Sequence, residues 1–147
     1  MLIKEIMTPK PLTIGPGKTV SEGLSLMYRY DIRRLPVLED GRLLGILTDR
    51  DVKQWMGRPF TSSLAGEDRD LGLPIEMLMT RNPITVLEDD PVEKAIDLLV
   101  EHKISGLPVV DHDNRLVGVL SEIDILRYTQ DLIDRLRETQ ETPRTGR

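Results

Sequence analysis

The chain has 147 residues, enough for one compact domain or two closely packed halves, and its 39% apolar residues suffice for a core. A chain of this length is not expected to form a large enzyme active-site scaffold. The formal net charge of −5 argues against a nucleic-acid-binding protein, which normally carries a basic patch. The absence of cysteine excludes disulfides, thiolate metal sites and a cysteine nucleophile.

The N-terminal residues and the apolar runs give no sign of membrane targeting. Residues 1–7 lack the basic region and the apolar stretch of a signal peptide. No apolar run approaches the roughly 18 residues that a transmembrane helix needs. We therefore expect a soluble, cytoplasmic protein that neither inserts into a membrane nor binds nucleic acid.

The first predicted elements follow Pro11. Residues 11–14 combine a proline with β-branched side chains and are predicted to be extended. Thr19 and Glu22 then have the spacing of a capping box, which predicts the start of a helix. Apolar residues at helical spacing should form one face of this helix: Val20, Leu24, Met27 and Tyr28.

A hairpin and a second helix complete this first unit. Two apolar runs, 35–38 and 43–47, flank the turn residues 39–41 and are predicted to be antiparallel strands. Thr48 and Asp51 repeat the capping-box spacing and predict another helix. The order over residues 1–58 is therefore βαββα.

Residues 59–74 are predicted to connect this unit to the next one over the surface, because they are mostly polar and contain glycine. Trp55 and Phe60 are interpreted as buried anchors of this connection. They are not expected to stack on nucleic-acid bases, since no basic stripe accompanies them.

The same order of elements returns in residues 75–127. In this copy Asp90 is the predicted N-cap of the first helix and Pro91 its first residue. Its apolar face should consist of Val92, Ala95, Ile96, Leu99 and Val100. The matching positions of the two copies include Met7 and Met79, Thr8 and Thr80, Thr13 and Thr85, Ile32 and Ile104, the Leu-Pro-Val triplets at 35–37 and 107–109, and the motifs Gly45–Asp51 and Gly118–Asp124. A unit of about 50 residues is marginal alone, so the duplication predicts two similar units that pack on each other.

Beyond the second copy, apolar residues continue at helical spacing from Ile125 to Leu136, whereas residues 142–147 contain none. We expect residues 128–147 to form a protruding C-terminal helix followed by a disordered tail.

A tandem βαββα repeat that carries Leu-Pro-Val and then Gly-h-h-[Thr/Ser]-x-x-Asp, where h is apolar, closely resembles a pair of CBS domains, also called a Bateman module. The resemblance covers roughly residues 1–127, and it rests on order, spacing and duplication together. It implies an α/β (α+β) fold in which two βαββα repeats pack with pseudo-twofold symmetry and form two clefts. Many such modules bind adenosine-containing ligands in these clefts and dimerise.

The resemblance also implies which residues face the clefts. Asp51 and Asp124 match the position whose carboxylate holds a ribose, and an ionised carboxylate can accept hydrogen bonds from two vicinal hydroxyls. Thr48 and Ser121 match a hydroxyl that contacts ribose or phosphate. The other candidate ligand-binding residues are Thr13, Arg33, Arg34, Pro36, Thr85, Gly106 and Pro108.

Both main assignments have structural alternatives. Asp51 and Asp124 have a spacing that equally suits carboxylates that only cap their own helices. The Arg33–Arg34 pair has two interpretations. It binds phosphate, in which case the site is asymmetric, because the second copy has Ser105–Gly106 at these positions. Alternatively, it lies in solvent at a helix end and offsets the helix dipole.

The resulting functional prediction is a stand-alone CBS-domain protein, a regulatory module that senses AMP, ADP or ATP, with S-adenosylmethionine and NAD as further ligand candidates. Its expected partners are the adenine nucleotide, a second copy of the chain and a regulated protein that the sequence does not identify. The alternative is an interaction module with vestigial clefts that acts through its C-terminal helix. An enzyme is disfavoured, because His102 and His112 have no catalytic or metal-ligand spacing.

Overall fold

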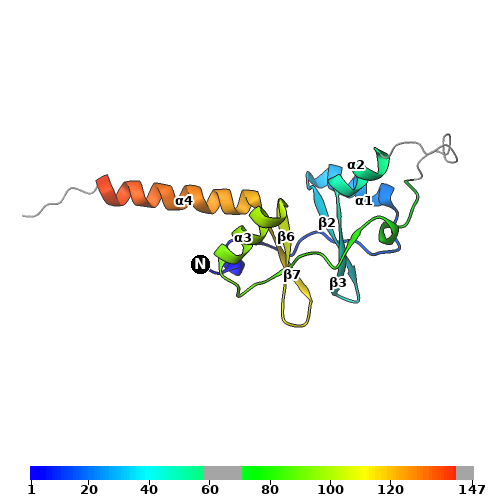
Figure 1. Ribbon diagram of the computed structural model, residues 1–147, viewed down its shortest axis with the longest axis horizontal. Coiled ribbons are helices and arrows are strands. Elements are labelled where there is room, and N and C mark those ends of the chain that lie inside the picture. The colour runs from blue at the N-terminus through cyan, green and yellow to red at the C-terminus, as the bar shows by residue number, and fades with distance from the viewer. Residues whose placement is uncertain (58–70, 142–147) are drawn as a thin grey trace, which may run out of the picture.

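The computed structural model describes residues 1–57 and 71–141, which form two similar halves with a long helix projecting from one of them (Figure 1). Phe60, most of the predicted connection at 59–74 and the predicted tail at 142–147 lie outside the described residues. Within the described ranges, no helix is both long and apolar enough to cross a membrane.

The first half contains two helices and an antiparallel hairpin. Its elements are α1 (Val20–Tyr30), β2 (Arg34–Glu39), β3 (Arg42–Thr48) and α2 (Asp49–Met56). The capping box of α1 forms as the spacing predicts: the Glu22 N–H donates to Thr19 Oγ1 at 3.1 Å, and the Thr19 N–H donates to Glu22 Oε2 at 2.8 Å. The hairpin prediction is confirmed, with Leu35 opposite Leu47 in the register.

The second half repeats this arrangement. Its elements are β5 (Val86–Leu87), α3 (Val92–His102), β6 (Gly106–Val110), β7 (Leu116–Ser121) and α4 (Glu122–Glu141). β5 is parallel to β6, and β6 pairs antiparallel with β7 so that Leu107 lies opposite Leu120. The two hairpins point the same way (Figure 1), and their tips touch where the Asn114 side-chain amide donates to the Leu43 carbonyl at 3.2 Å. The two-repeat α/β fold is thus confirmed.

The segments that precede each repeat are exchanged between the halves. β1 (Thr8–Pro9) follows a 3-10 turn at Ile3–Glu5 and pairs with β7 of the second half. β4 (Thr80–Arg81) follows a 3-10 turn at Ile75–Met77 and pairs with β3 of the first half. The sheets therefore have the strand orders β1-β7-β6-β5 and β2-β3-β4.

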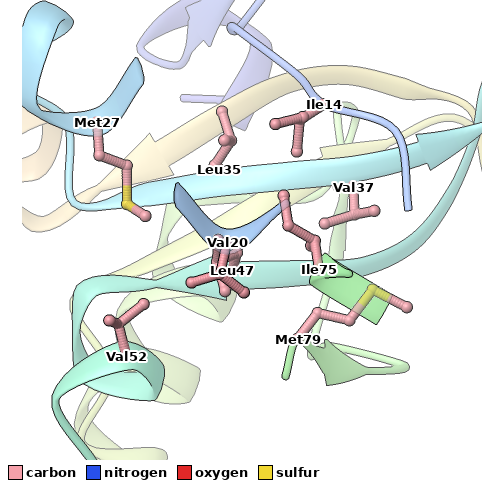
Figure 2. Packing of buried hydrophobic residues seen from close by; sticks show 9 residues of the cluster. All are labelled: Ile14, Val20, Met27, Leu35, Val37, Leu47, Val52, Ile75 and Met79. Carbon is pink, nitrogen blue, oxygen red and sulfur yellow. The ribbon is translucent and has the colours of Figure 1, made fainter. Parts of the chain in front are cut away.

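Residues of the exchanged segments pack in both hydrophobic cores. Ile75 and Met79 pack among residues of the first half, as Figure 2 shows beside Leu47 and Val37. Ile3 packs in the core of the second half and is fully buried. Each half is therefore completed by a segment from the other half's repeat, so the two halves depend on each other.

The exchange of strands explains why the repeated motif begins with a glycine, Gly45 or Gly118. A Cβ at Gly45 would lie 2.6 Å from the carbonyl oxygen of Thr80, and a Cβ at Gly118 would lie 2.9 Å from that of Thr8. Both distances are shorter than side chains tolerate. Glycine thus lets the exchanged strands come close enough to β3 and β7 to form hydrogen bonds.

One prediction about a short element is wrong. Residues 11–14 form no strand; only Ile14 bridges to Val37, because Pro11 lacks an N–H and the segment ends at Gly15-Pro16-Gly17. In the second copy the first strand of the repeated order does form, as β5 (Val86–Leu87).

The N-cap of α3 is Pro91 and not Asp90. Asp90 instead accepts hydrogen bonds from the Leu87 N–H and from Lys94 Nζ, both at 2.8 Å. The carboxylate is therefore engaged by the turn before the helix and by a lysine on the helix, and it does not cap the first turn.

The apolar faces of α1 and α3 are wider than the surface that covers them. Tyr28 is 91% exposed, and at the equivalent position in α3 Val100 is 73% exposed. Ile96 is exposed as well. The prediction that these residues lie on a buried face is wrong, because each helix buries only the narrower stripe directed at its sheet, such as Val20, Gly23 and Met27 in α1.

The C-terminal helix is one continuous element. α4 begins at Glu122, so the second helix of the repeat and the predicted C-terminal helix are the same 20-residue helix. It extends away from the sheets (Figure 1), and none of its residues is buried. In the first half, Trp55 of the shorter α2 is partly buried.

Candidate functional site

A cavity of about 640 Å³ lies at the boundary between the two halves. One wall comes from the first half, at the end of β3 and the start of α2 (residues 48–51), and the facing wall comes from the second half, at residues 103–106 after α3. Thr80 of the exchanged strand β4 also lines it. The cavity therefore exists only when both repeats are assembled.

Six of the predicted site residues line this cavity: Arg33, Arg34, Thr48, Asp51, Gly106 and Pro108. The other five do not line it. Thr13 instead lines a separate hollow of about 450 Å³ beside Ile14 and Lys18. Pro36 is buried in β2, Thr85 is partly buried next to the lining residue Ile84, and Ser121 and Asp124 lie at the start of α4.

Asp51 is both a capping residue and a wall of the cavity. Its Oδ2 accepts the Thr48 N–H at 2.9 Å, and the Asp51 N–H donates to Thr48 Oγ1 at 3.0 Å. Its Oδ1 accepts the hydroxyl of Thr80 at 3.1 Å. A carboxylate has about four lone-pair sites, so acceptor capacity for a ligand remains after these two bonds.

Asp124 repeats this arrangement at the start of α4. Its Oδ2 accepts the Ser121 N–H at 2.9 Å and the Ser121 hydroxyl at 3.0 Å, and its Oδ1 accepts the Thr8 hydroxyl at 3.4 Å. Capping is thus a real role of both aspartates. Sequence reasoning did not select Thr8 and Thr80 as site residues, although their recurrence in the repeated Met-Thr pair was a usable signal.

Arg34 crosses the boundary between the halves. It stands at the first position of β2, and its guanidinium donates to the hydroxyl of Ser105 in the second half. Burial lowers the pKa of Arg34 from its ordinary value, while the carboxylates of Glu122 and Asp49 act in the opposite direction. The alternative in which Arg34 is a solvated residue at a helix end is wrong, because Arg34 lies in a strand and is partly buried.

The lining of the cavity is slightly basic, although the chain as a whole is acidic. Four basic residues line it, namely Arg33, Arg34, Arg50 and Lys103, against the three acidic residues Asp49, Asp51 and Glu122. The lining therefore has an excess of one positive charge, whereas the whole chain has a net charge of −5. The start of α2 adds the positive end of a helix dipole.

The rest of the lining is largely apolar. It includes Ile46, Ile84, Leu99 and Ile104. A cavity with apolar walls and a few convergent polar groups is typical of a small-molecule site. Among residues 1–57 and 71–141, no group of three or more histidine, aspartate or glutamate residues is arranged to hold a metal ion.

Comparison with known proteins gives the same family for both halves. The model of the CBS domain matches residues 3–58 and 75–131. A CBS domain-containing protein of Dictyostelium discoideum is 35% identical over 130 residues, which cover 86% of this chain and 89% of the relative. An uncharacterised protein of Methanocaldococcus jannaschii is 33% identical over 130 residues, but the chain spans only 46% of its length.

Solved structures with bound ligands share the fold. CBSX2 in complex with AMP has a TM-score of 0.77 and 28% identity, and the match covers 89% of this chain and 97% of CBSX2. The CBS domain pair of protein MJ0100, in complex with 5′-methylthioadenosine and S-adenosyl-L-methionine, has a TM-score of 0.73 and 30% identity over 89% of this chain and 97% of that one. With both repeats matched in sequence and in structure, this chain belongs to the CBS domain family as a tandem CBS pair.

Proposed function

We propose that this CBS pair is a regulatory module, and not an enzyme, that binds an adenosine-containing nucleotide in the cavity at Asp51. The observation that carries the proposal is the local excess of positive charge in a half-apolar cavity of an otherwise acidic chain. A nucleotide combines a flat apolar base with an anionic phosphate, and the cavity offers surfaces of both kinds. The adenosyl ligands of CBSX2 and of the MJ0100 pair support the same ligand class.

The polar groups divide naturally between ribose and phosphate. The free lone pairs of Asp51 suit the two vicinal ribose hydroxyls, and each such charge-assisted bond contributes about 1.5–3 kcal/mol. Arg33, Arg50 and Lys103 supply cationic groups for phosphate oxygens, beside the N-terminus of α2.

The apolar lining suits the purine. Ile46 comes from the first half, whereas Ile84 and Ile104 come from the second, so a base between them would contact both repeats. A ligand bound in this way contacts both halves, so its binding would fix their relative position. A regulated partner would then sense the bound ligand through the relative position of the halves. We place this sensing role in the cytoplasm, with AMP, ADP or ATP as ligand and S-adenosylmethionine and NAD as the further candidates.

Isothermal titration calorimetry tests the proposal directly. The purified chain is titrated with AMP, ADP, ATP, S-adenosylmethionine and NAD, with guanosine monophosphate as a control for unspecific phosphate binding. We expect saturable, micromolar binding of at least one adenosyl ligand. Silence across the panel at millimolar concentration, or equal binding of the guanosine control, would refute the proposal.

A second candidate function is an interaction module that acts through α4. The exposed apolar residues Leu132, Ile133 and Leu136 on the projecting helix favour it, since an isolated helix gains nothing from presenting them to water. A second copy of the chain is the simplest partner, which would give a homodimer. Truncation after Arg127 should then reduce the mass measured by light scattering after size exclusion; an unchanged mass would count against this function.

A further inference from the structure

The hydroxyl of Thr80 connects the exchanged strand β4 to the carboxylate that faces the cavity. It donates to Asp51 Oδ1 at 3.1 Å, and Thr80 is itself one of the residues that line the cavity. The two residues belong to different repeats and lie 29 positions apart in the chain. This hydrogen bond is therefore a contact between the two repeats within the candidate site.

The backbone of Thr80 is held in place by its neighbours. Thr80 pairs with Ile46 of β3 in the register. Its carbonyl oxygen lies so close to β3 that a Cβ at Gly45 would be only 2.6 Å away. The preceding residue, Met79, is buried in the core of the first half. Because this backbone is anchored, the hydroxyl reaches Asp51 from a defined position.

The two hydrogen bonds that Asp51 accepts from the protein are divided between its two oxygens. Oδ2 accepts the Thr48 N–H at 2.9 Å, and Oδ1 accepts the Thr80 hydroxyl. A carboxylate oxygen has about two lone-pair sites, so one acceptor site remains on each oxygen. Bonds to both oxygens also oppose rotation of the carboxylate. Asp51 thus presents two acceptor sites in a fixed orientation, which suits the two vicinal hydroxyls of a ribose.

We propose that Thr80 is a positioning residue for the ribose: its hydroxyl holds the Asp51 carboxylate in the orientation that binds both ribose hydroxyls of a nucleotide. This inference rests on the proposed function and deepens it, because it makes ribose binding depend on a strand from the other repeat. Without the Thr80 bond the carboxylate would be free to turn, and the ligand would have to immobilise it. By the same coupling, a bound ribose stabilises the contact between the repeats.

The test compares AMP with its dideoxy analogue, whose sugar lacks both hydroxyls, by calorimetry on the wild type and Thr80→Val. Valine has nearly the shape of threonine but no hydroxyl. We expect Thr80→Val to weaken AMP about 3- to 10-fold, as for the loss of one hydrogen bond, and to leave the affinity for the dideoxy analogue unchanged. Thr80→Ser keeps the hydroxyl and should bind AMP as the wild type does.

A double substitution tests whether Thr80 acts through Asp51. Thr80→Val added to Asp51→Ala should cause no further loss of AMP affinity, because no carboxylate remains to be oriented. This comparison needs only AMP, so it decides the question even where the dideoxy analogue binds too weakly to measure. A further loss in the double variant as large as the loss in Thr80→Val alone would overturn the inference.

Thr8→Val is the matched control. It removes the equivalent hydroxyl from the other exchanged strand, where Thr8 donates to Asp124 at 3.4 Å, but Thr8 does not line the cavity. Its AMP affinity should stay at the wild-type value. Circular dichroism checks that each variant folds, and Thr80→Ala replaces the valine variant if that one does not.

Three further results would overturn the inference while leaving nucleotide binding established. They are unchanged AMP binding in Thr80→Val, equal weakening of AMP and the dideoxy analogue in that variant, and an equal loss of AMP affinity in Thr8→Val. Silence of the wild type toward AMP and the other adenosyl ligands would overturn both proposals.

Discussion

The carboxylate of Asp51 accepts two hydrogen bonds from the protein itself before any ligand is considered. One comes from the Thr48 N–H, at the start of its own helix, and the other from the hydroxyl of Thr80, on a strand that comes from the other repeat. The side chain therefore stabilises the start of α2, attaches the exchanged strand and faces the cavity. A single substitution to alanine would disturb all three roles together.

Two substitutions at Asp51 separate capping from ligand binding. In Asp51→Asn the amide oxygen still accepts the Thr48 N–H, so the free energy of unfolding should stay near the wild-type value. Asp51→Ala loses these bonds and should lower that free energy by about 0.5–1.5 kcal/mol for each. Both variants lose the charge that would hold the ribose, so nucleotide affinity should fall about 10- to 100-fold in both.

Urea unfolding and calorimetry measure the two effects. If both variants bind the nucleotide as tightly as the wild type, the carboxylate serves only as a cap. A fall in affinity for Asp51→Ala alone would point to lost helix geometry and not to lost charge.

At the scale of elements, α1, α2 and α4 begin at reciprocal caps that a spacing of three residues encodes, whereas α3 begins at Pro91 without a side-chain cap. The box of α1 is the clearest case. The hydrogen bond from the Thr19 N–H lowers the pKa of Glu22 below its ordinary value, since it favours the charged carboxylate. The folded state therefore holds Glu22 ionised more strongly than the unfolded chain does.

This shift predicts a pH dependence with a definite sign. Because the folded pKa is lowered, Glu22 contributes stability above its unfolded value of about 4.5, and this contribution disappears as the pH falls through the lower folded pKa. The stability difference between wild type and Glu22→Gln should thus be present at pH 7 and shrink toward pH 3. Urea unfolding at both pH values measures it, and a difference that grew on acidification would contradict the assignment.

At the scale of the whole molecule, the exchanged segments make the two repeats one cooperative unit. Ile3 is the third residue of the chain, yet it is fully buried in the core of the second half, and β1 completes that half's sheet. Terminal residues of most domains contribute little to stability. In this protein the N-terminal segment is a structural part of the second repeat.

Ile3→Ala should consequently be as damaging as a central core substitution. We expect a loss of about 2–5 kcal/mol in the free energy of unfolding, through lost burial and the resulting cavity. Leu12→Ala is the matched control, because Leu12 lies in the same N-terminal region but is 37% exposed, and its loss should be smaller. Urea unfolding compares them, and equal effects would show that the exchanged segment is not integral to the core.

Much of the fold followed from local patterns in the sequence. The capping boxes at Thr19 and Thr48, the two hairpins and the duplication were all predicted, because each depends on residue types only a few positions apart or on plain repetition. The resemblance to CBS domains, which rests on these patterns, placed Thr48, Asp51 and Arg33 among the candidate residues, and all three line the cavity.

The contacts that define the cavity were not predictable in this way. Thr80 meets Asp51 across 29 positions, and Arg34 meets Ser105 across 71. The exposure of Tyr28 likewise depends on what packs over its helix and not on the spacing within it.

The sequence by itself determined the repeated βαββα order, the helix starts and the residue types available for a nucleotide. Only the tertiary structure decided that the leading strands are exchanged, that Asp51 and not Asp124 faces the described cavity, and that the guanidinium of Arg34 in the first half meets Ser105 in the second. The physical reason is that capping and turn preferences act within a few residues of backbone. Strand exchange and contacts between the two halves arise only when segments that are distant in the chain pack together.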